Sequence, residues 1–372
     1  MESRLICSMI PMLLVAGNTG AAEIYNQDGH KLDINGTVAG VHHFPDSGRD
    51  KDNSYMRFGF LGETQINPYI TGYGQWQYQS QLSQGEKDQG QDSFSRLGFV
   101  GMKFAEYGSF DYGRNFGVLY DVLALTDRQP ELAGDAFGTD NYLSQRGNNL
   151  ATYRNKGFFG QVDGLDFAVQ YQAENRAGEK AGEGRGIQSA NGNGYGMSIA
   201  YDFGHGVSTT GALTSANRTR AQKELPYGHG GDKANAYAAA IKYDAKKYYL
   251  AIMYSQSYNL LRFGEFKPNE QEKKKISGFA NKARTIEAVA QYLFDFGLTP
   301  SLAYVQTWGY EIEQYGRQDL RKFIDLGVTY NFNKNMSTFI DYKINLLQEN
   351  DFTKKADIKQ DNIVALGIQY QF

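Results

Sequence analysis

Apolar and polar residues alternate with a period of two along most of this chain. In residues 323–332, Ile324, Leu326 and Val328 alternate with small or polar residues, and residues 336–346 repeat the pattern. This period indicates strands with one apolar and one polar face and argues against helices. The chain also contains 27 Tyr, 23 Phe and 43 Gly but only 7 Pro, which favours many strands joined by tight turns. The net charge of −3 excludes a strongly basic nucleic-acid-binding protein.

Residues 1–21 have the features of a secretory signal peptide. Arg4 precedes an apolar run over residues 5–16, and small residues follow it up to the expected cleavage point. The run is too short to cross a membrane as a helix, and a buried N-terminal helix fits the pattern less well. The only cysteine, Cys7, lies in this segment. The mature chain, residues 22–372, is therefore expected to form no disulfide and to carry no thiol nucleophile.

The mature chain contains no stretch near the roughly 18 apolar residues that a membrane-spanning helix needs, so any membrane span must be made of strands. Short connections such as 203–205 and 332–335 alternate with long polar ones such as 175–193 and 259–281. Tight turns on one side and large loops on the other are typical of an outer-membrane barrel. A secreted β-propeller or lectin is the alternative, but the sequence has no blade-length repeat.

We therefore predict an all-β fold, a 16-stranded antiparallel transmembrane β-barrel forming one domain over residues 22–372. A sheet in lipid must close on itself, because no water satisfies its edges. The strands are expected at 30–44, 55–66, 70–82, 94–104, 108–114, 148–155, 165–174, 194–202, 206–216, 234–243, 247–257, 282–293, 298–308, 322–331, 336–346 and 361–372.

A family resemblance is carried by segments at both ends and in the middle of the chain, namely residues 22–29, 62–67, 72–76, 108–115, 151–155, 277–282, 332–338 and 361–367. With these segments the sequence resembles the enterobacterial general diffusion porins of the Gram-negative porin family, and it is most similar to their osmoporin branch. The resemblance implies a homotrimeric barrel in the bacterial outer membrane. It also implies a water-filled channel for passive diffusion of small hydrophilic solutes and ions, with a third loop that folds inward.

The longest connection without strong alternation covers about residues 115–147 and is rich in carboxylates. A loop of that length in a compact fold is usually functional or disordered. In the family it corresponds to the third extracellular loop, which narrows the pore. The resemblance places Asp127 and Glu131, with Asp135 nearby, on the acidic side of the constriction. Phe116 and Tyr120, at the start of the loop, are possible pore-lining residues.

Three arginines are expected on the opposite side of the constriction. Arg57, between Met56 and Phe58, and Arg96, before Leu97, are assigned to the lumen by parity, and Arg146 by its match to the family. An arginine facing lipid at the midplane would cost roughly 2–4 kcal/mol, whereas charges inside a membrane protein usually line water-filled paths. The alternative is that all three are ordinary solvated charges.

Several positions depart from the family pattern, and Gln145 separates the chain from one branch of the family. Thr37 replaces a common lysine and Gln77 a common glutamate, both with lumen parity, so one cation and one anion are lost together. Arg128 follows Asp127 where an apolar residue is usual; it either points away and is inert, or pairs with Asp127 and weakens cation preference. Gln145 precedes Arg146 where the phosphate-porin branch has lysine. These features predict mild cation selectivity.

The remaining charged residues each allow two interpretations. Glu86 matches the position by which the family latches onto a neighbouring subunit, but a solvated loop charge is equally compatible. The run Lys273–Lys275 is either solvated or in contact with lipopolysaccharide phosphates. The five histidines lack metal-ligand spacing, so neither a metal nor a cofactor is expected.

Two other functional classes fit the sequence less well. An outer-membrane barrel hydrolase would need a nucleophile, a base and an orienting group, and no Ser/His/Asp set is evident. A sugar-specific channel would need aromatic residues along the lumen, whereas Tyr248, Tyr254, Tyr330 and Tyr342 fall on the outward parity. The sequence thus favours a non-specific channel over an enzyme.

Overall fold

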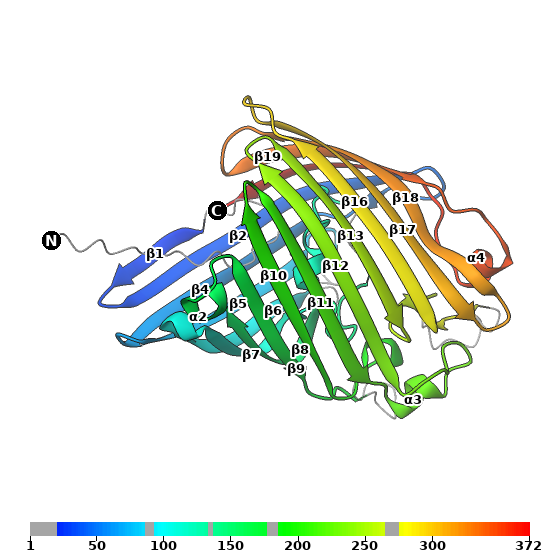
Figure 1. The fold of residues 1–372 in the computed structure, drawn as a ribbon. Coiled ribbons are helices and arrows are strands. Elements are labelled where there is room, and N and C mark those ends of the chain that lie inside the picture. Colours follow the sequence, from blue (N-terminus) through cyan, green and yellow to red (C-terminus); the bar gives the residue numbers. More distant parts are fainter. Residues whose placement is uncertain (1–20, 86–92, 133–136, 177–184, 265–274) are drawn as a thin grey trace.

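The computed structural model describes residues 21–85, 93–132, 137–176, 185–264 and 275–372. The predicted signal peptide, except for Ala21, lies outside this range. Long antiparallel strands close into a barrel (Figure 1), and the prediction of a 16-stranded all-β barrel is confirmed. The strands of the wall are β2 (His30–Pro45), β4 (Tyr55–Asn67), β5 (Ile70–Gln81), β6 (Phe94–Phe104), β7 (Ser109–Phe116), β8 (Arg146–Asn155), β9 (Leu165–Gln172), β10 (Gly194–Gly204), β11 (Val207–Asn217), β12 (Lys233–Ala245), β13 (Tyr248–Tyr258), β16 (Lys282–Tyr292), β17 (Leu298–Ile312), β18 (Gly316–Asn331), β19 (Met336–Asn345) and β20 (Ile363–Gln371).

Strand β2 closes the barrel, because it pairs with β4 on one side and with the last strand, β20, on the other. Thr37 shows the closure directly: it lies opposite Arg57 of β4 and opposite Gln371 of β20. The first half of β2 also pairs with β1 (Ala22–Gln27), a short strand that the sequence did not predict. Closure satisfies the hydrogen-bonding groups that an open sheet would leave unpaired in lipid.

Side chains of the wall alternate between its two faces, as the sequence pattern predicted. In β13, Leu250 and Ile252 are 46% and 50% exposed, whereas Ala251 and Met253 between them are 7% and 0% exposed. The exposed apolar side chains form the outer face, which contacts lipid or a neighbouring subunit. The inner face carries the polar residues. Their contribution explains why the mean hydropathy of this chain is low although its outer face is apolar. No helix in the described part of the chain is long and apolar enough to cross a membrane.

Turns and loops lie at opposite ends of the barrel (Figure 1). At the turn end, Asn67 closes a tight turn because its side-chain oxygen accepts hydrogen bonds from the amides of Tyr69 and Ile70. Short helices at the loop end have side-chain caps: Thr219 caps α3 (Arg220–Lys223), and Asn350 caps α4 (Asp351–Lys355). A further short helix, α2 (Gly157–Gly160), lies in the turn between β8 and β9. The remaining elements in the described residues are 3-10 turns η1 (Ala105–Tyr107) and η2 (Ile187–Ser189), and short strands β3 (Lys51–Asp52), β14 (Arg262–Phe263) and β15 (Gly278–Phe279).

One predicted loop is wrong. Residues 309–321 were expected to form a long polar loop, but β17 and β18 extend through them and are joined by residues 313–315. The strands continue through these residues because the alternation extends past Trp308, and Ile312 is buried at 2% exposure. A bulge near Trp308 accommodates the change of register. The polar composition concealed this extension.

Candidate pore constriction

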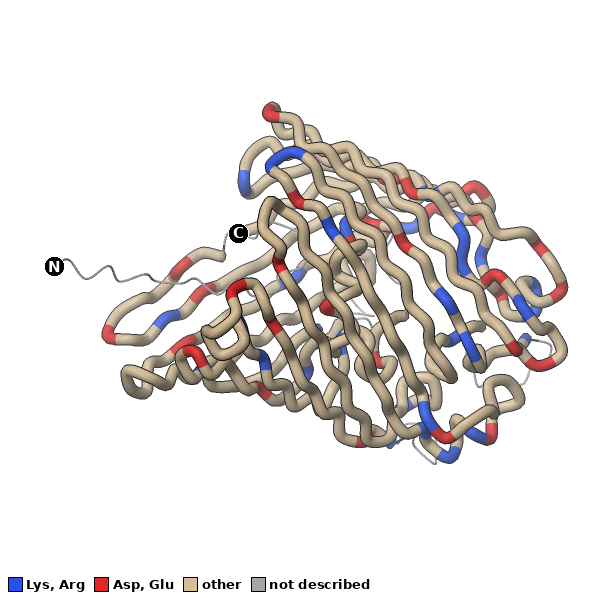
Figure 2. The backbone as a smooth tube through the Cα atoms, viewed as in Figure 1, with Lys and Arg blue, Asp and Glu red and all other residues tan. Residues whose placement is uncertain are grey.

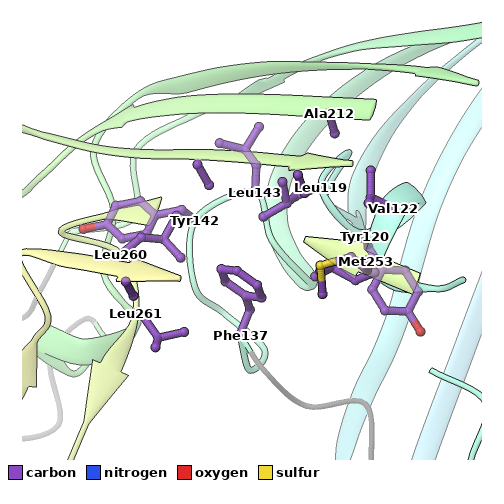
Figure 3. Packing of buried hydrophobic residues seen from close by; sticks show 14 of the residues in the cluster. Leu119, Tyr120, Val122, Phe137, Tyr142, Leu143, Ala212, Met253, Leu260 and Leu261 are labelled. Carbon is purple, nitrogen blue, oxygen red and sulfur yellow. The ribbon is translucent and has the colours of Figure 1, made fainter. Parts of the chain in front are cut away.

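The third long connection, residues 117–145, folds into the barrel and is called the inner loop below. It begins with the short helix α1 (Tyr120–Leu123). Leu119 and Val122 are both fully buried, and Figure 3 shows them near Ala212 and Met253 of the barrel wall. The apolar start of the inner loop therefore packs against the inside of the wall, so the predicted inward-folded third loop is confirmed.

The wall beneath the inner loop is built from small side chains. Alanines occupy successive inward positions of β12, where Ala236, Ala238 and Ala240 are at most 6% exposed. Small residues leave room for a second layer inside the barrel, because larger ones would fill the space by themselves. The other buried alanines of this apolar cluster that lie on wall strands are Ala212, Ala216, Ala234, Ala251, Ala283 and Ala303.

Polar contacts fix the first half of the inner loop. Both guanidinium nitrogens of Arg154 donate to the Asp121 carboxylate, at 2.8 and 3.0 Å, and the Ser198 hydroxyl donates to the same carboxylate at 2.5 Å. The Val118 amide donates to the side-chain oxygen of Gln170 at 3.0 Å. Charge-assisted contacts from β8 and β10 thus hold α1 in one position.

A second set of contacts fixes the middle of the inner loop. The amides of Glu131 and Leu132 both donate to one carboxylate oxygen of Asp341 on β19, at 2.9 and 2.8 Å. Thr126 donates to Glu287 of β16 at 2.6 Å. The first part of the loop is therefore anchored to β8 and its middle part to β19, and the loop lies across the lumen between them.

The basic side of the candidate constriction is formed by neighbouring strands. Arg57 donates to the side-chain oxygen of Gln79 at 3.0 Å, and Arg96 donates to the same oxygen at 3.1 Å. Arg96 also donates to Gln77 at 2.9 Å. The structure therefore brings Arg57 and Arg96 together on the lumen side of β4, β5 and β6.

Arg96 faces the lumen as predicted, but strand parity is not the reason. Leu97 also faces inward, with 8% exposure, so strict alternation would turn Arg96 toward the lipid. A bulge between β5 and β6 resets the alternation at Arg96, since Leu97 pairs with Gln77 and Ser95 pairs with Tyr78. Bulges commonly re-aim a side chain in this way.

Arg146 approaches the same group from the other end of the inner loop. Its guanidinium carbon lies 5.8 Å from the centre of the Phe116 ring, and that ring stacks on Tyr120 at 4.5 Å. The Tyr120 hydroxyl donates to Asp127 at 2.7 Å. A path of contacts thus runs from Arg146 through the two predicted aromatic residues to the acidic part of the loop. Thr37, 8% exposed, also faces inward, opposite Arg57.

The acidic side contains Asp127 and Glu131. Asp127 accepts from Tyr120, and Glu131 accepts from an imidazole nitrogen of His43 on β2 at 3.2 Å. No pattern in the sequence indicates this contact of His43. Asp135 lies outside the described residues, as does Glu86, the possible subunit latch.

Arg128 takes neither of the two positions considered from the sequence. Its guanidinium carbon lies 4.4 Å from the centre of the Tyr249 ring on β13, and its backbone oxygen accepts from Gln291 at 2.7 Å. Stacking of a guanidinium on an aromatic face is favourable and directional. The extra cation is therefore held at the interface between the inner loop and the wall.

A further charged cluster, which sequence reasoning missed, includes Asp140 of the inner loop. Arg114 donates to both carboxylate oxygens of Asp140, at 2.7 and 3.2 Å, and Arg185 donates to one of them at 3.1 Å. Burial by itself would raise the pKa of Asp140, but the two guanidinium groups outweigh burial, so this pKa lies below its usual value. Arg114, Asp140 and Arg146 also line a pocket of about 510 Å³.

The residues that the structure describes contain no group of three or more His, Cys, Asp or Glu side chains able to hold a metal ion. The lumen instead presents opposed fixed charges on a closed barrel crossed by an anchored loop. This combination defines a channel protein of the outer membrane.

Comparisons with known proteins agree with that class. The model of the Gram-negative porin family matches residues 27–372, and the chain belongs to this family. Outer membrane porin C of Serratia marcescens is 53% identical, and outer membrane porin N of Escherichia coli (strain K12) is 48% identical; in each case 100% of both chains is covered. Among solved structures, the OmpF complex of Salmonella typhi with daunomycin has a TM-score of 0.85 at 42% identity, covering 94% of this chain and 100% of that one.

The predicted family, membrane and function are thereby confirmed. The protein is a non-specific porin of the bacterial outer membrane, through which small hydrophilic solutes and ions diffuse passively, and it is not an enzyme. An anion-selective porin from Comamonas acidovorans is only 14% identical, with a TM-score of 0.61, and shows the shared fold alone.

Proposed function

We propose that this porin is mildly cation-selective and that its selectivity is set where the inner loop faces the arginines of the wall. The observation that carries the proposal is the anchoring of the loop across the lumen, with Asp127 and Glu131 on it and with Arg57 and Arg96 on the facing strands. Opposed fixed charges produce a transverse field. The field is poorly screened within a gap comparable to the Debye length of about 8 Å at physiological salt.

The field acts on solutes through the water that it orients. A small polar solute replaces the water contacts that it displaces, whereas an apolar solute loses them without compensation. Passage therefore favours small hydrophilic molecules and needs no tight binding. The position of Arg128 supports a net cation preference, because its contact with Tyr249 holds its charge against the wall.

Planar-bilayer recording tests the proposal. We expect ohmic conductance that closes in three steps, is unaffected by sugars, and gives a zero-current potential of the sign for a modest cation preference. A clear anion preference would refute the selectivity proposal. Sugar block below about 1 mM would instead indicate a substrate-specific channel of appreciable affinity.

The three closing steps follow from a second proposal, that the protein forms a homotrimer. Glycines replace side chains on the outer face of β4 and β5, where Gly62, Gly72 and Gly74 line an outward groove of about 630 Å³ together with Val100 and Met102. Such an apolar face with few side chains is suited to close contact with another subunit. We propose Glu86 as the latch to that subunit. Chemical crosslinking of subunits in a Glu86→Ala variant tests this role.

We further propose that lipopolysaccharide contacts the opposite side of the barrel. On the outer face of β16–β18, Arg284 lies 5.3 Å from the Tyr310 ring centre, and Arg317 lies 5.8 Å from that of Trp308. Lys282 pairs with Tyr258, and Lys322 pairs with Gln306. Because paired residues lie on the same face of the wall, both lysines also face outward. Figure 2 shows Lys and Arg positions along the strands on the loop side of the barrel. Aromatic and basic residues together at a membrane interface suit phosphorylated headgroups.

The alternative lipopolysaccharide contact, the run Lys273–Lys275, has two members outside the described residues, and Lys275 pairs with Asp357 at 3.0 Å. Removal of residues 1–21 also remains a proposal. N-terminal sequencing of the outer-membrane form should begin at Ala22, and retention of the leader would contradict it.

A further inference from the structure

The returning half of the inner loop, residues 137–145, meets a turn in the connection between β9 and β10. This turn, residues 185–190, contains η2 and is called the outer turn below. Carbonyls at the end of a helical turn have no partner within it, so they need donors from side chains or water. In the outer turn four consecutive backbone carbonyls each accept a hydrogen bond from a side chain; they belong to Ile187, Gln188, Ser189 and Ala190.

Gln222 of α3 supplies two of these donors and also contacts the inner loop. Its side-chain amide donates to the backbone oxygens of Ile187 and Ala190, at 2.9 and 2.7 Å. Its side-chain oxygen accepts from the Tyr142 hydroxyl at 3.1 Å and from the Thr219 amide at 2.9 Å. An amide side chain has two N–H donors and two lone pairs, so Gln222 makes every hydrogen bond open to it. Gln222 and Tyr142 are 0% and 2% exposed, so water does not compete for these bonds.

Two arginines form links of the same kind. Arg262 of β14 donates to a carbonyl of the outer turn at 3.1 Å and to the Thr139 carbonyl of the inner loop at 2.9 Å. Arg185 donates to another carbonyl of the outer turn at 3.2 Å and to the Asp140 carboxylate at 3.1 Å. Each of the three side chains therefore joins the outer turn to the inner loop, and their inner-loop partners all lie within residues 139–142.

Different parts of the molecule hold the two halves of the inner loop. The wall holds the first half and the middle, through Asp121 and through the amides that bind Asp341. It also reaches the returning half, because Arg114 of β7 donates to Asp140. The three links come instead from the connections between β9 and β10, β11 and β12, and β13 and β16, called the outer loops below. Loops are less constrained than the strands they join, so the arrangement of the outer loops contributes to the position of the returning half.

The returning half leads directly to the constriction. The Asp140 amide donates to the backbone oxygen of Arg146 at 2.8 Å, and the Gly117 amide donates to that of Gln145 at 2.9 Å. Arg146 approaches the basic side of the candidate constriction, and Gly117 follows the pore-lining candidate Phe116. A displacement of residues 139–142 would therefore move groups at the constriction.

The links also continue toward the outer surface of the molecule. Phe263, the neighbour of Arg262 on β14, packs against Phe352 of α4 with 5.2 Å between ring centres. Gln222 is buried beneath α3, whose residue Arg220 has an 89% exposed side chain. Contacts of one or two side chains thus separate the surface helices α3 and α4 (Figure 1) from the groups that hold the inner loop.

We propose that Gln222 and Arg262 are positioning residues of the pore, which couple the outer loops to the constriction. They hold the returning half of the inner loop against the outer turn, so a displacement of the outer loops reaches Arg146 through packed and hydrogen-bonded contacts. The inference rests on the proposed function in one respect, namely that the inner loop and Arg146 line the narrow part of the pore.

Hydrogen–deuterium exchange of the purified porin measures this coupling. Gln222→Met has a side chain of similar length that makes none of the four hydrogen bonds, so fragments covering residues 137–145 should exchange about tenfold faster. Fragments covering residues 118–126, which the wall holds, should keep the wild-type rate, and this excludes a general loosening of the barrel. Arg220→Met is the matched control, because Arg220 lies on the same helix but is exposed; it should leave both rates unchanged.

Coupling between two sites is reciprocal, so a change in the inner loop should reach the outer turn. Tyr142→Phe removes only the hydroxyl that donates to Gln222, and residues 185–190 should then exchange about threefold faster or more. Unchanged exchange of the outer turn in this variant would overturn the inference. Equal acceleration of residues 118–126 and 137–145 in Gln222→Met would also overturn it.

Single-channel recording supplies the readout at the pore. Gln222→Met and Arg262→Met should each add sublevels and current noise to the open channel, and Arg220→Met should give wild-type traces. Arg262→Lys can still donate to one of the two carbonyls and should lie between Arg262→Met and the wild type. Wild-type traces in both methionine variants would overturn the inference. These readouts do not depend on which ion the pore prefers, so an anion preference would refute the proposed selectivity and leave the coupling standing.

Discussion

Arg57 and Arg96 donate to the same oxygen atom, Oε1 of Gln79, at 3.0 and 3.1 Å. Two like charges that share one neutral acceptor are held close together in spite of their mutual repulsion. The shared contact orients both guanidinium groups toward the lumen, where they face the inner loop. Gln79 is therefore a positioning residue for the basic side of the constriction, and its replacement should change selectivity without removing an arginine.

Gln79→Glu should increase the cation preference of the pore. The new carboxylate keeps both hydrogen bonds and adds a negative charge between the arginines, so we expect the cation-to-anion permeability ratio to rise about twofold or more. Zero-current potentials in a KCl gradient measure this change. Gln79→Met, which has a similar size and no charge, should have a smaller effect, and equal effects of the two substitutions would contradict the electrostatic explanation.

Neutralising the arginines of the wall should also increase the cation preference. Arg57→Gln, Arg96→Gln and Arg146→Gln should each raise the cation preference, because each removes a positive charge from the gap. Arg284→Gln is the control, since Arg284 lies on the outer face and donates there to Gln256 at 3.0 Å. If Arg284→Gln changed the selectivity as much as the other three substitutions, the arginines would act through the net charge of the protein and not at a constriction.

Anchoring of the inner loop depends on the Arg154–Asp121 pair. Arg154→Met leaves the Asp121 carboxylate buried with Ser198 as its remaining described donor, which should cost about 3–5 kcal/mol of loop anchoring. We expect noisier single-channel currents and a lower denaturation temperature of the oligomer. Adding Asp121→Leu to this variant should restore part of the loss, and no recovery would indicate that the pair does not act as a unit.

Acidification should release the inner loop near Asp140. The pKa of Asp140 lies below its ordinary value because of Arg114 and Arg185, so the carboxylate stabilises the folded state at pH values above the ordinary pKa. That contribution is lost as the pH falls through the lowered pKa. Asp140→Asn should lose about 1–3 kcal/mol already at neutral pH and should show a weaker destabilisation by acid. Denaturation midpoints between pH 7 and 2 measure both effects, and parallel curves for variant and wild type would contradict them.

The strands could be predicted from the sequence because their alternation is local. Each wall strand has one lipid-facing row, as Leu250 and Ile252 illustrate, and a slip of one residue would turn that row into the lumen. The extension of β17 and β18 was missed because polar residues dominate it near its turn. The lumen position of Arg96 depends on a bulge, which alternation alone does not reveal.

The contacts of the inner loop could not be predicted in the same way. His43 meets Glu131, and Arg128 meets Tyr249, only because the loop follows one path across the barrel. That path depends on small alanines of β12 and on Asp341, which are distant in sequence from the loop. Neither contact produces a periodic pattern in the sequence. The sequence therefore shows which residues are charged but not which residues they contact.

The central claim is that solutes pass between the carboxylates of the inner loop and the arginines of the wall. A single cysteine introduced as Asp127→Cys tests it most directly, because residues 22–372 contain no other cysteine. A positively charged methanethiosulfonate reagent, added to open channels in a planar bilayer, should reduce conductance in steps and shift selectivity toward anions. Lys247→Cys, at the turn end of the barrel, should give no such steps. Unchanged conductance and selectivity after complete labelling at position 127 would contradict the account.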